Sequence, residues 1–258
     1  MKPYYQEKRN KRDKSQEGDT VIPSQKGKGS SCIPLQYTVI PIQYDHCKDW
    51  ILKKHYSKRI PPINYAFGLY DSVNRLHGIC TFGTPCKLMN DGACIFENLA
   101  VSTLELNRLV INENHQKNLL SYFVERCLRL LPSPLCVVSY SDIGEGHHGY
   151  IYQATNWLYT GVTMQTGGYT YYFDNDWQHP RTTVSKFGTR EHSVIISKFP
   201  DIEYKKVSRK HRYFKFLGTH RQIKEMKSKL KYDIFPYPKG NNKRYDASYE
   251  PQTQGMLI

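Results

Sequence analysis

The chain has 258 residues, and its 37 Lys and Arg residues exceed its 23 Asp and Glu residues, which gives a formal net charge of +14. The seven Cys residues form no C-x-x-C pair, and no segment resembles a signal sequence or is apolar enough to span a bilayer. These features argue against membrane-spanning and disulfide-stapled secreted proteins, and they predict a reduced, cytoplasmic protein. The apolar share of 39% is enough for one sizeable core.

The apolar patterns predict alternating strands and helices along the chain. Residues 1–31 are too polar to fold alone and are expected to form a disordered basic arm. Strands are expected at residues 33–42, 65–70, 76–83, 94–101, 135–140, 157–164, 169–173 and 211–218. Helices are expected at residues 45–55 and 115–131, around Tyr152, and after the candidate N-cap Thr219. This order predicts an α/β fold in which helices flank a mixed central sheet.

The positive charge is concentrated at the two ends of the chain. Residues 1–31 contain eight Lys or Arg against four Asp or Glu, and residues 204–244 contain fourteen against two, whereas residues 32–203 are balanced. This layout predicts a densely negative partner, with nucleic acid first, and a solubilising face is the alternative. Aromatic residues interleave the second basic run and favour nucleic acid. The predicted DNA contacts are Lys205, Lys206, Arg209, Lys210, Arg212, Lys215 and Arg221.

Composition divides the chain into four parts. The arm at residues 1–31 precedes a charge-balanced domain at residues 32–203, which the motifs described next predict to be catalytic. A basic strand and helix at residues 204–240 are expected to pack on that domain as a nucleic-acid-binding extension. Residues 241–258 are expected to form a flexible tail.

The stretch at residues 139–161 carries the chemistry. Asp142 ends an apolar strand, a Gly- and His-rich turn follows, and a short helix then carries Tyr152 ahead of a strand that opens at Trp157. Acyltransferase folds build sites at strand ends in this way. The stretch therefore predicts a site for group transfer.

The element order resembles that of the GNAT acyltransferases. Many of these carry a Tyr on the fourth helix, five residues before an aromatic residue that opens the next strand, as Tyr152 and Trp157 do here. Residues 97–101 look like the GNAT fourth strand. GNATs usually continue into a Gly-containing loop that binds the coenzyme A pyrophosphate, but residues 108–118 contain no Gly. An anion could still sit before the next helix, and the expected donor-binding residues are Arg108, Asn112, Lys117 and Asn118.

A set of ordered motifs resembles the Mom family of phage DNA-modification proteins, which are GNAT-like. The motifs are KKHYSKR at 53–59, FGLY at 67–70, ELNRLVI at 105–111, KNLLSYF at 117–123, SYSD at 139–142, GYIYQATNWLYTG at 149–161 and HRYFKFLG at 211–218. The resemblance implies an enzyme of the bacterial host cytoplasm that converts adenine in double-stranded DNA to a methylcarbamoyl, glycinamide-like derivative. It further implies that the modification shields phage DNA from restriction, and that the target base leaves the duplex.

By this resemblance, His55, Tyr56, Arg108, Asp142 and Tyr152 form the functional set. Asp142 is expected to act as a general base or to orient the adenine amine, or else to form an Asx turn. Tyr152 is expected to protonate the leaving group, or to pack against the sheet. His55 is either a base or a cation at a helix C-terminus, and Tyr56 could stack on the target base. Arg108 is expected to contact a phosphate or carboxylate, or to form a structural ion pair.

Several alternatives stay open at this point. Glu97 is a second candidate base. His147 and His148 could form a metal site with Asp142, and iron has been suggested for the family, although the spacing matches no known site. The acyl donor is glycyl-tRNA on chemical grounds or acetyl-coenzyme A by analogy with the fold, so tRNA is a second candidate partner. The alternative functions are an ordinary amine N-acetyltransferase and a non-catalytic DNA-binding protein on a GNAT scaffold.

Overall fold

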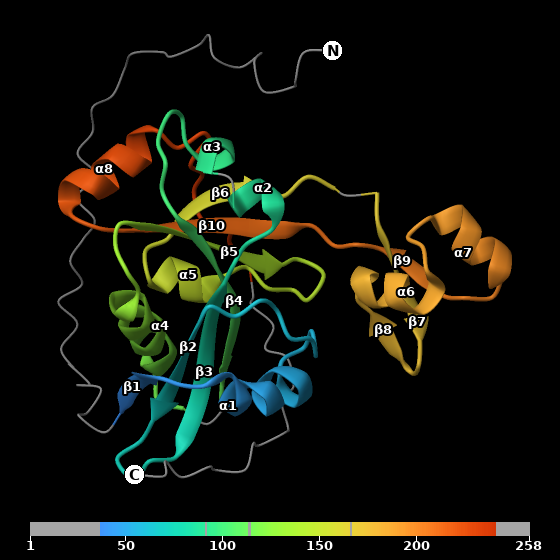
Figure 1. Cartoon of the computed structure of the whole chain (residues 1–258), viewed down its shortest axis with the longest axis horizontal. Coiled ribbons are helices and arrows are strands. Elements are labelled where there is room, and N and C mark those ends of the chain that lie inside the picture. Colours follow the sequence, from blue (N-terminus) through green and yellow to red (C-terminus); the bar gives the residue numbers. More distant parts are fainter. Residues whose placement is uncertain (1–36, 91, 113–114, 166, 241–258) are drawn as a thin grey trace. The chain divides into compact units, whose positions relative to one another are not determined.

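The computed structural model describes residues 37–90, 92–112, 115–165 and 167–240 (Figure 1). The arm predicted at residues 1–31 and the tail predicted at residues 241–258 lie outside the described residues. No helix in the described ranges has the length and apolar character needed to cross a membrane.

A seven-stranded sheet forms the centre of the fold (Figure 1). Its strands lie in the order β1-β2-β3-β4-β5-β10-β6, and neighbouring strands are antiparallel except for the parallel pair β4 and β5. The predicted mixed sheet with flanking helices is therefore confirmed. The strands are β1 Thr38–Pro41, β2 Tyr65–Tyr70, β3 Leu76–Gly83, β4 Thr103–Ile111, β5 Leu135–Asp142, β6 Leu158–Val162 and β10 Lys210–Leu217.

Helices cover both faces of this sheet. On one face, α4 and α5 pack on a core that includes Phe82, Phe123 and Trp157. On the other face, α1 and the π-helix η1 cover β2, β3 and β4, whereas α2, α3 and α8 cover β5 and β10. These helices are α1 Tyr44–Asp49, η1 Trp50–Lys54, α2 Lys87–Asn90, α3 Gly92–Ile95, α4 Leu119–Leu130, α5 Tyr150–Ala154 and α8 His220–Ser228.

The strands β4 and β5 stay paired only along the first residues of β4. The paired stretch ends where Glu105 lies opposite Val138. Just beyond it, the Ser139 hydroxyl lies 2.7 Å from the carbonyl oxygen of Leu106 and bridges the two strands. Because the backbones separate after this bridge, side chains at the ends of both strands can line a common cleft.

The prediction of a strand at residues 94–101 is wrong. Residues 92–95 form α3, and Phe96 makes an isolated bridge to Leu230 instead of joining the sheet. The side chains of Ile95 and Phe96 are both buried in the cluster that contains Met226 of α8, so this apolar run reflects helix packing. The strand that precedes β5 in the sheet is β4, and residues 108–111 belong to that strand instead of the loop after it.

The strand β10 is integral to the sheet, although it falls within the segment expected as an extension. It lies between β5 and β6, with Tyr213 opposite Ser139. The helix α8 follows, and the predicted cap is confirmed, because the side chain of Thr219 and that of Gln222 each accept a hydrogen bond from the other residue's backbone amide.

Residues 163–209, which we call the insert, connect β6 to β10. They form a three-stranded antiparallel sheet in the order β8-β7-β9 together with two helices (Figure 1). Of these elements, only β7 was predicted from the sequence. The elements are β7 Tyr169–Phe173, β8 Asp176–Gln178, α6 Pro180–Phe187, α7 His192–Lys198 and β9 Tyr204–Lys206.

Candidate active site

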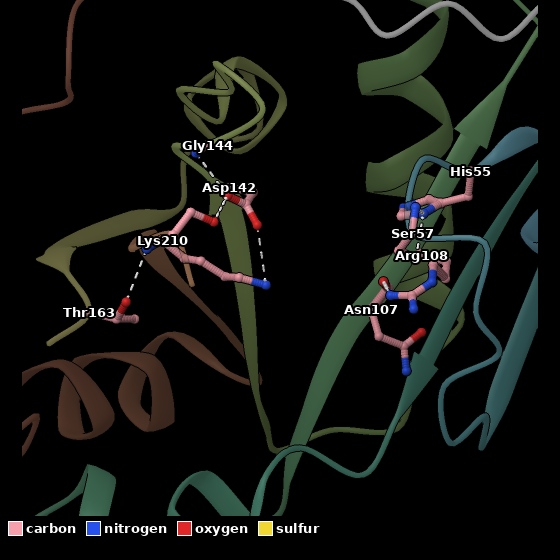
Figure 2. A network of polar contacts seen from close by, with 9 residues as sticks. His55, Ser57, Asn107, Arg108, Asp142, Gly144, Thr163 and Lys210 are labelled. Carbon is pink, nitrogen blue, oxygen red and sulfur yellow. Dashed lines mark hydrogen bonds and ion pairs between the residues drawn. The ribbon is translucent and has the colours of Figure 1, made fainter. Parts of the chain in front are cut away.

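A cleft of about 510 Å³ lies where β4 and β5 separate. All members of the predicted functional set line it, although they come from the segment after η1, from β4, from the end of β5 and from α5. They are His55, Tyr56, Arg108, Asp142 and Tyr152. Figure 2 shows two groups of polar contacts among the cleft residues and their neighbours, one around Asp142 and Lys210 and one around His55 and Arg108.

Asp142 uses its two carboxylate oxygens differently. Its Oδ1 atom accepts hydrogen bonds from the Gly144 amide, at 2.9 Å, and from the Ser208 hydroxyl. Its Oδ2 atom lies 3.5 Å from the Nζ atom of Lys210 (Figure 2). The Asx turn and a contact suited to function are therefore both present, on different oxygens. Oδ2 is therefore the carboxylate oxygen that the turn does not use.

The ring of Tyr152 is buried between aromatic neighbours. The ring centre lies 5.1 Å from that of Trp157 and 5.0 Å from that of Tyr213. The phenol oxygen lies 2.7 Å from the Ser139 hydroxyl. Burial raises the pKa of Tyr152, so the phenol keeps its proton at neutral pH and can act as a proton donor. Packing and proton donation are thus compatible in this residue.

The ring of His55 is held by the turn that follows η1. Its Nδ1 atom accepts a hydrogen bond from the Ser57 amide at 3.1 Å, so a neutral ring carries its proton on Nε2. Burial, and after it the positive charges of Arg108, His147 and Lys210, holds the pKa of His55 well below its usual value. We therefore interpret His55 as a neutral hydrogen-bond donor, which disfavours one of the two alternatives, a cation at a helix C-terminus.

Tyr56 presents an aromatic ring within the cleft. Its ring centre lies 4.4 Å from that of His55 in a stacked arrangement and 5.7 Å from that of His147 in an edge-on one. The rings of His55, Tyr56 and His147 therefore lie together in the lining of the cleft.

Arg108 binds backbone carbonyls. Its Nε and Nη2 atoms donate to the Arg59 carbonyl at 3.2 and 2.8 Å. Its Nη1 atom donates to the Asn107 carbonyl at 2.6 Å (Figure 2). Within the described residues it forms no ion pair with a carboxylate, which disfavours the structural ion pair. Arg108 thus fastens the segment after His55 to β4 and adds positive charge to the cleft.

Glu105 is a cleft residue that the sequence analysis did not single out. It lines the cleft from β4, and within the described part of the chain its carboxylate forms no hydrogen bond or ion pair. Burial raises the pKa of Glu105, and the positive charges of Lys210 and Arg108 oppose the shift. A carboxyl group in this state suits proton transfer. The second candidate base, Glu97, is exposed and does not line the cleft.

The residues expected to bind the donor are only partly brought together. Arg108 and Asn118 line the cleft, whereas Asn112 and Lys117 do not. The Asn112 side chain accepts a hydrogen bond from the Lys54 ammonium group at 3.2 Å, and Lys117 is exposed.

The predicted DNA contacts occupy several environments. Lys210 lines the cleft, and Lys215 is paired with Glu125 at 3.1 Å. The guanidinium of Arg212 lies 3.8 Å from the ring centre of Tyr232. The remaining four are exposed, namely Lys205, Lys206, Arg209 and Arg221. These four side chains are therefore accessible from the solvent.

The residues considered for a metal site are Asp142, His147 and His148, and the two His rings contact other aromatic rings. His147 contacts the ring of Tyr56, and the ring of His148 lies 5.6 Å from that of His211. Among the described residues, no group of three or more His, Cys, Asp or Glu side chains is arranged to hold a metal ion.

Comparison with known proteins finds similarity to a protein family, to a curated protein and to solved structures. A model of the Mom protein family matches residues 36–239. The chain is 28% identical over 195 residues to the methylcarbamoylase Mom of Escherichia phage Mu, covering 73% of this chain and 78% of that protein. Among solved structures, a spermidine/spermine N-acetyltransferase of Vibrio cholerae matches with a TM-score of 0.40 and 9% identity over 70% of this chain and 92% of its own. A GNAT-family acetyltransferase of Bacillus cereus matches with a TM-score of 0.36 and 10% identity, covering 70% of this chain and 96% of that one.

Proposed function

This chain belongs to the Mom protein family, and we propose that it is a transferase that modifies the exocyclic amine of adenine in phage DNA. The expected product is the methylcarbamoyl derivative, in keeping with the name of the phage Mu relative, and it would protect the DNA from restriction. The observation that carries the proposal is the cleft, because five candidate residues from distant segments line it together.

The chemistry assigns a role to each polar group. The adenine amine is a poor nucleophile because its lone pair is delocalised into the ring, so it needs a proton acceptor and an activated donor. We assign proton acceptance to Glu105 and orientation of the amine to Oδ2 of Asp142. Tyr152 gives its proton to the leaving group. Arg108 and Lys210 supply positive charge to the oxyanion that develops during transfer.

Positive charge continues from the cleft toward the insert. The Nη1 atom of Arg59 lies 3.4 Å from Nδ1 of His179, the N-cap of α6. Burial, followed by the charges of Arg59, Lys210 and Arg181, lowers the pKa of His179 to about 4. Several cations thus act on one short region, which suits the approach of a phosphate backbone.

Charge reversal at exposed basic residues should weaken DNA binding and flatten its dependence on salt. We expect the slope of log affinity against log salt to fall by about 0.9 for each phosphate that the protein no longer neutralises. The variant is Lys206→Glu with Arg209→Glu and Arg221→Glu, because all three residues are exposed and lie outside the cleft lining. Fluorescence anisotropy of a labelled duplex at several salt concentrations measures the slope.

The control for this variant changes the net charge equally at other exposed positions. Lys48→Glu with Lys87→Glu and Arg129→Glu serves, since these residues belong to α1, α2 and α4. A slope that falls equally in both variants would show that the effect is one of net charge, and an unchanged slope in the first would show that the basic run is only a solvated surface.

Glycyl-tRNA is the donor that we propose. In transfer, the adenine nitrogen bonds to the glycyl carbonyl, its proton passes to the base, and the ester bond breaks as the tRNA hydroxyl takes a proton from Tyr152. The glycine amine then lies one five-membered ring away from the adenine carbon that bears the nitrogen. Its attack there, with expulsion of the carboxamide, gives the glycinamide isomer, and proximity makes such intramolecular steps fast. Acetyl-coenzyme A lacks the nitrogen and would need a second source of it.

A reconstitution with purified protein, duplex DNA and labelled glycine charged onto tRNA tests both the function and the donor. Label in adenine is the expected result. Label that enters adenine only from labelled acetyl-coenzyme A would overturn the glycyl donor and leave the function standing. If the protein binds the DNA but leaves its adenine unchanged with either donor, the result would favour the non-catalytic DNA-binding alternative.

A further inference from the structure

The small sheet of the insert has one face covered by helices. The hydroxyl of Tyr171 in β7 lies 2.9 Å from Nδ1 of His192 in α7, and the ring of Phe173 lies 5.1 Å from that of Phe187 in α6. Because side chains alternate along a strand, Thr170 and Tyr172 of β7 point to the opposite face.

Neighbouring strands place two more side chains on that opposite face. The register pairs Tyr172 with Trp177 of β8, and Thr170 with Lys205 of β9. The ring centres of Tyr172 and Trp177 lie 5.6 Å apart, and the two residues are 40% and 38% exposed. The Nζ atom of Lys205 lies 4.1 Å from the ring centre of Trp177. We call Thr170, Tyr172, Trp177 and Lys205 the aromatic face.

We propose that the aromatic face binds unpaired nucleotides of the DNA strand that carries the target adenine. Exposed aromatic rings beside a cation are the features on which unpaired bases stack, whereas the paired bases of a duplex offer no free ring face. Extrusion of the adenine locally unstacks its strand and so creates the ligand. The choice of DNA rests on the proposed function, whereas the geometry of the face does not.

A short basic segment joins the aromatic face to the cleft. Lys205, Lys206, Arg209 and Lys210 fall within six residues, and Lys210 lines the cleft beside Asp142. Five residues of chain reach at most about 18 Å, which corresponds to about five base steps of one DNA strand. One strand can therefore contact both sites. This continuity of positive charge favours the DNA substrate over a protein partner.

The distribution of Trp residues provides a specific readout. Of the three Trp residues in the chain, Trp50 and Trp157 are 2% and 0% exposed, so stacking of added bases should quench Trp177. We expect a single-stranded DNA oligonucleotide to quench the intrinsic fluorescence of the native protein. In anisotropy measurements with the same labelled oligonucleotide, Trp177→Ala and Tyr172→Ala should each weaken binding roughly 5- to 150-fold.

The matched control is Tyr44→Ala, which removes a ring that is 42% exposed on α1 and should leave binding unchanged. Equal quenching by a duplex of G·C pairs alone, which offers no adenine to extrude, would overturn the proposal. So would tighter binding of an RNA of the same sequence, or native affinity in both aromatic variants. These measurements contain no acyl donor. A native protein that binds single strands as expected but never modifies adenine would therefore refute the proposed function alone.

Discussion

Replacing Tyr152 by Phe is expected to lower the rate of adenine modification by roughly 10²- to 10⁴-fold, because the phenol can no longer protonate the leaving group. The Phe ring would keep its packing against Trp157 and Tyr213, and Ser139 would keep its hydrogen bond to the Leu106 carbonyl. The fold and the affinity for DNA should therefore remain near native. Protection of DNA from a restriction endonuclease, followed over time, measures the rate.

Replacing Asp142 by Asn should have an effect of the same order. The amide oxygen of Asn can still accept the hydrogen bonds from Gly144 and Ser208, so the Asx turn is preserved. The negative charge that faces Lys210 is removed, and the atom at the position of Oδ2 becomes a donor that repels the substrate amine.

Two matched changes outside the cleft serve as controls for these variants. Tyr159→Phe removes a buried hydroxyl that lies 2.8 Å from Nδ1 of His211. Asp71→Asn changes a carboxylate that also forms an Asx turn, through the Val73 amide, and that pairs with His77 at 2.8 Å. Both controls should modify adenine at the native rate. Native rates in the Tyr152 and Asp142 variants as well would show that the chemistry takes place elsewhere.

Replacing Glu105 by Gln should lower the rate of adenine modification to a similar extent and stabilise the folded protein. The pKa of Glu105 is higher in the folded than in the unfolded protein, where a Glu has a pKa of about 4.3. Ionising this carboxyl therefore destabilises the fold as the pH rises from the unfolded pKa through the folded pKa. A neutral amide carries no such cost. A melting temperature at neutral pH that increases in the variant, together with loss of the reaction, is the expected pair of results.

The pH profile separates proton acceptance from a structural role. In the native protein, the rate should fall on acidification at a pH above that expected for an ordinary Glu, because a protonated Glu105 cannot accept a proton. Glu105→Asp should retain part of the activity. Glu125→Gln, which changes a carboxylate paired with Lys215 outside the cleft, is the control. A native profile in Glu105→Gln would exclude this residue as the base and return that role to Asp142.

Much of the fold follows from local patterns in the sequence. The apolar runs at residues 65–70 and 76–83 form β2 and β3 at the predicted bounds, and the stripe at residues 115–131 contains the buried helix α4. The prediction of a strand at residues 94–101 failed because a short apolar run has the same pattern in a buried strand and at a buried helix end. In the observed strand, β4, the charged residues Glu105 and Arg108 interrupt the apolar pattern, and both of them line the cleft.

The candidate site was only partly predictable, since its members meet through tertiary structure. Nothing local indicates that Asp142 would lie beside Lys210, because that proximity depends on β10 pairing with β5. The basic run looked uniform in the sequence, yet the alternation along β10 sends Lys215 to a partner on α4 and Lys210 to the cleft. The aromatic face likewise depends on the register of three short strands.

The most direct test of the central claim is mass analysis of nucleosides from the DNA of cells that express the native chain or its Tyr152→Phe variant. The cleft as a site of adenine modification predicts a modified deoxyadenosine in the first sample and a near absence of it in the second, at equal protein levels. Unmodified deoxyadenosine in the native sample, or equal modification in both, would contradict it.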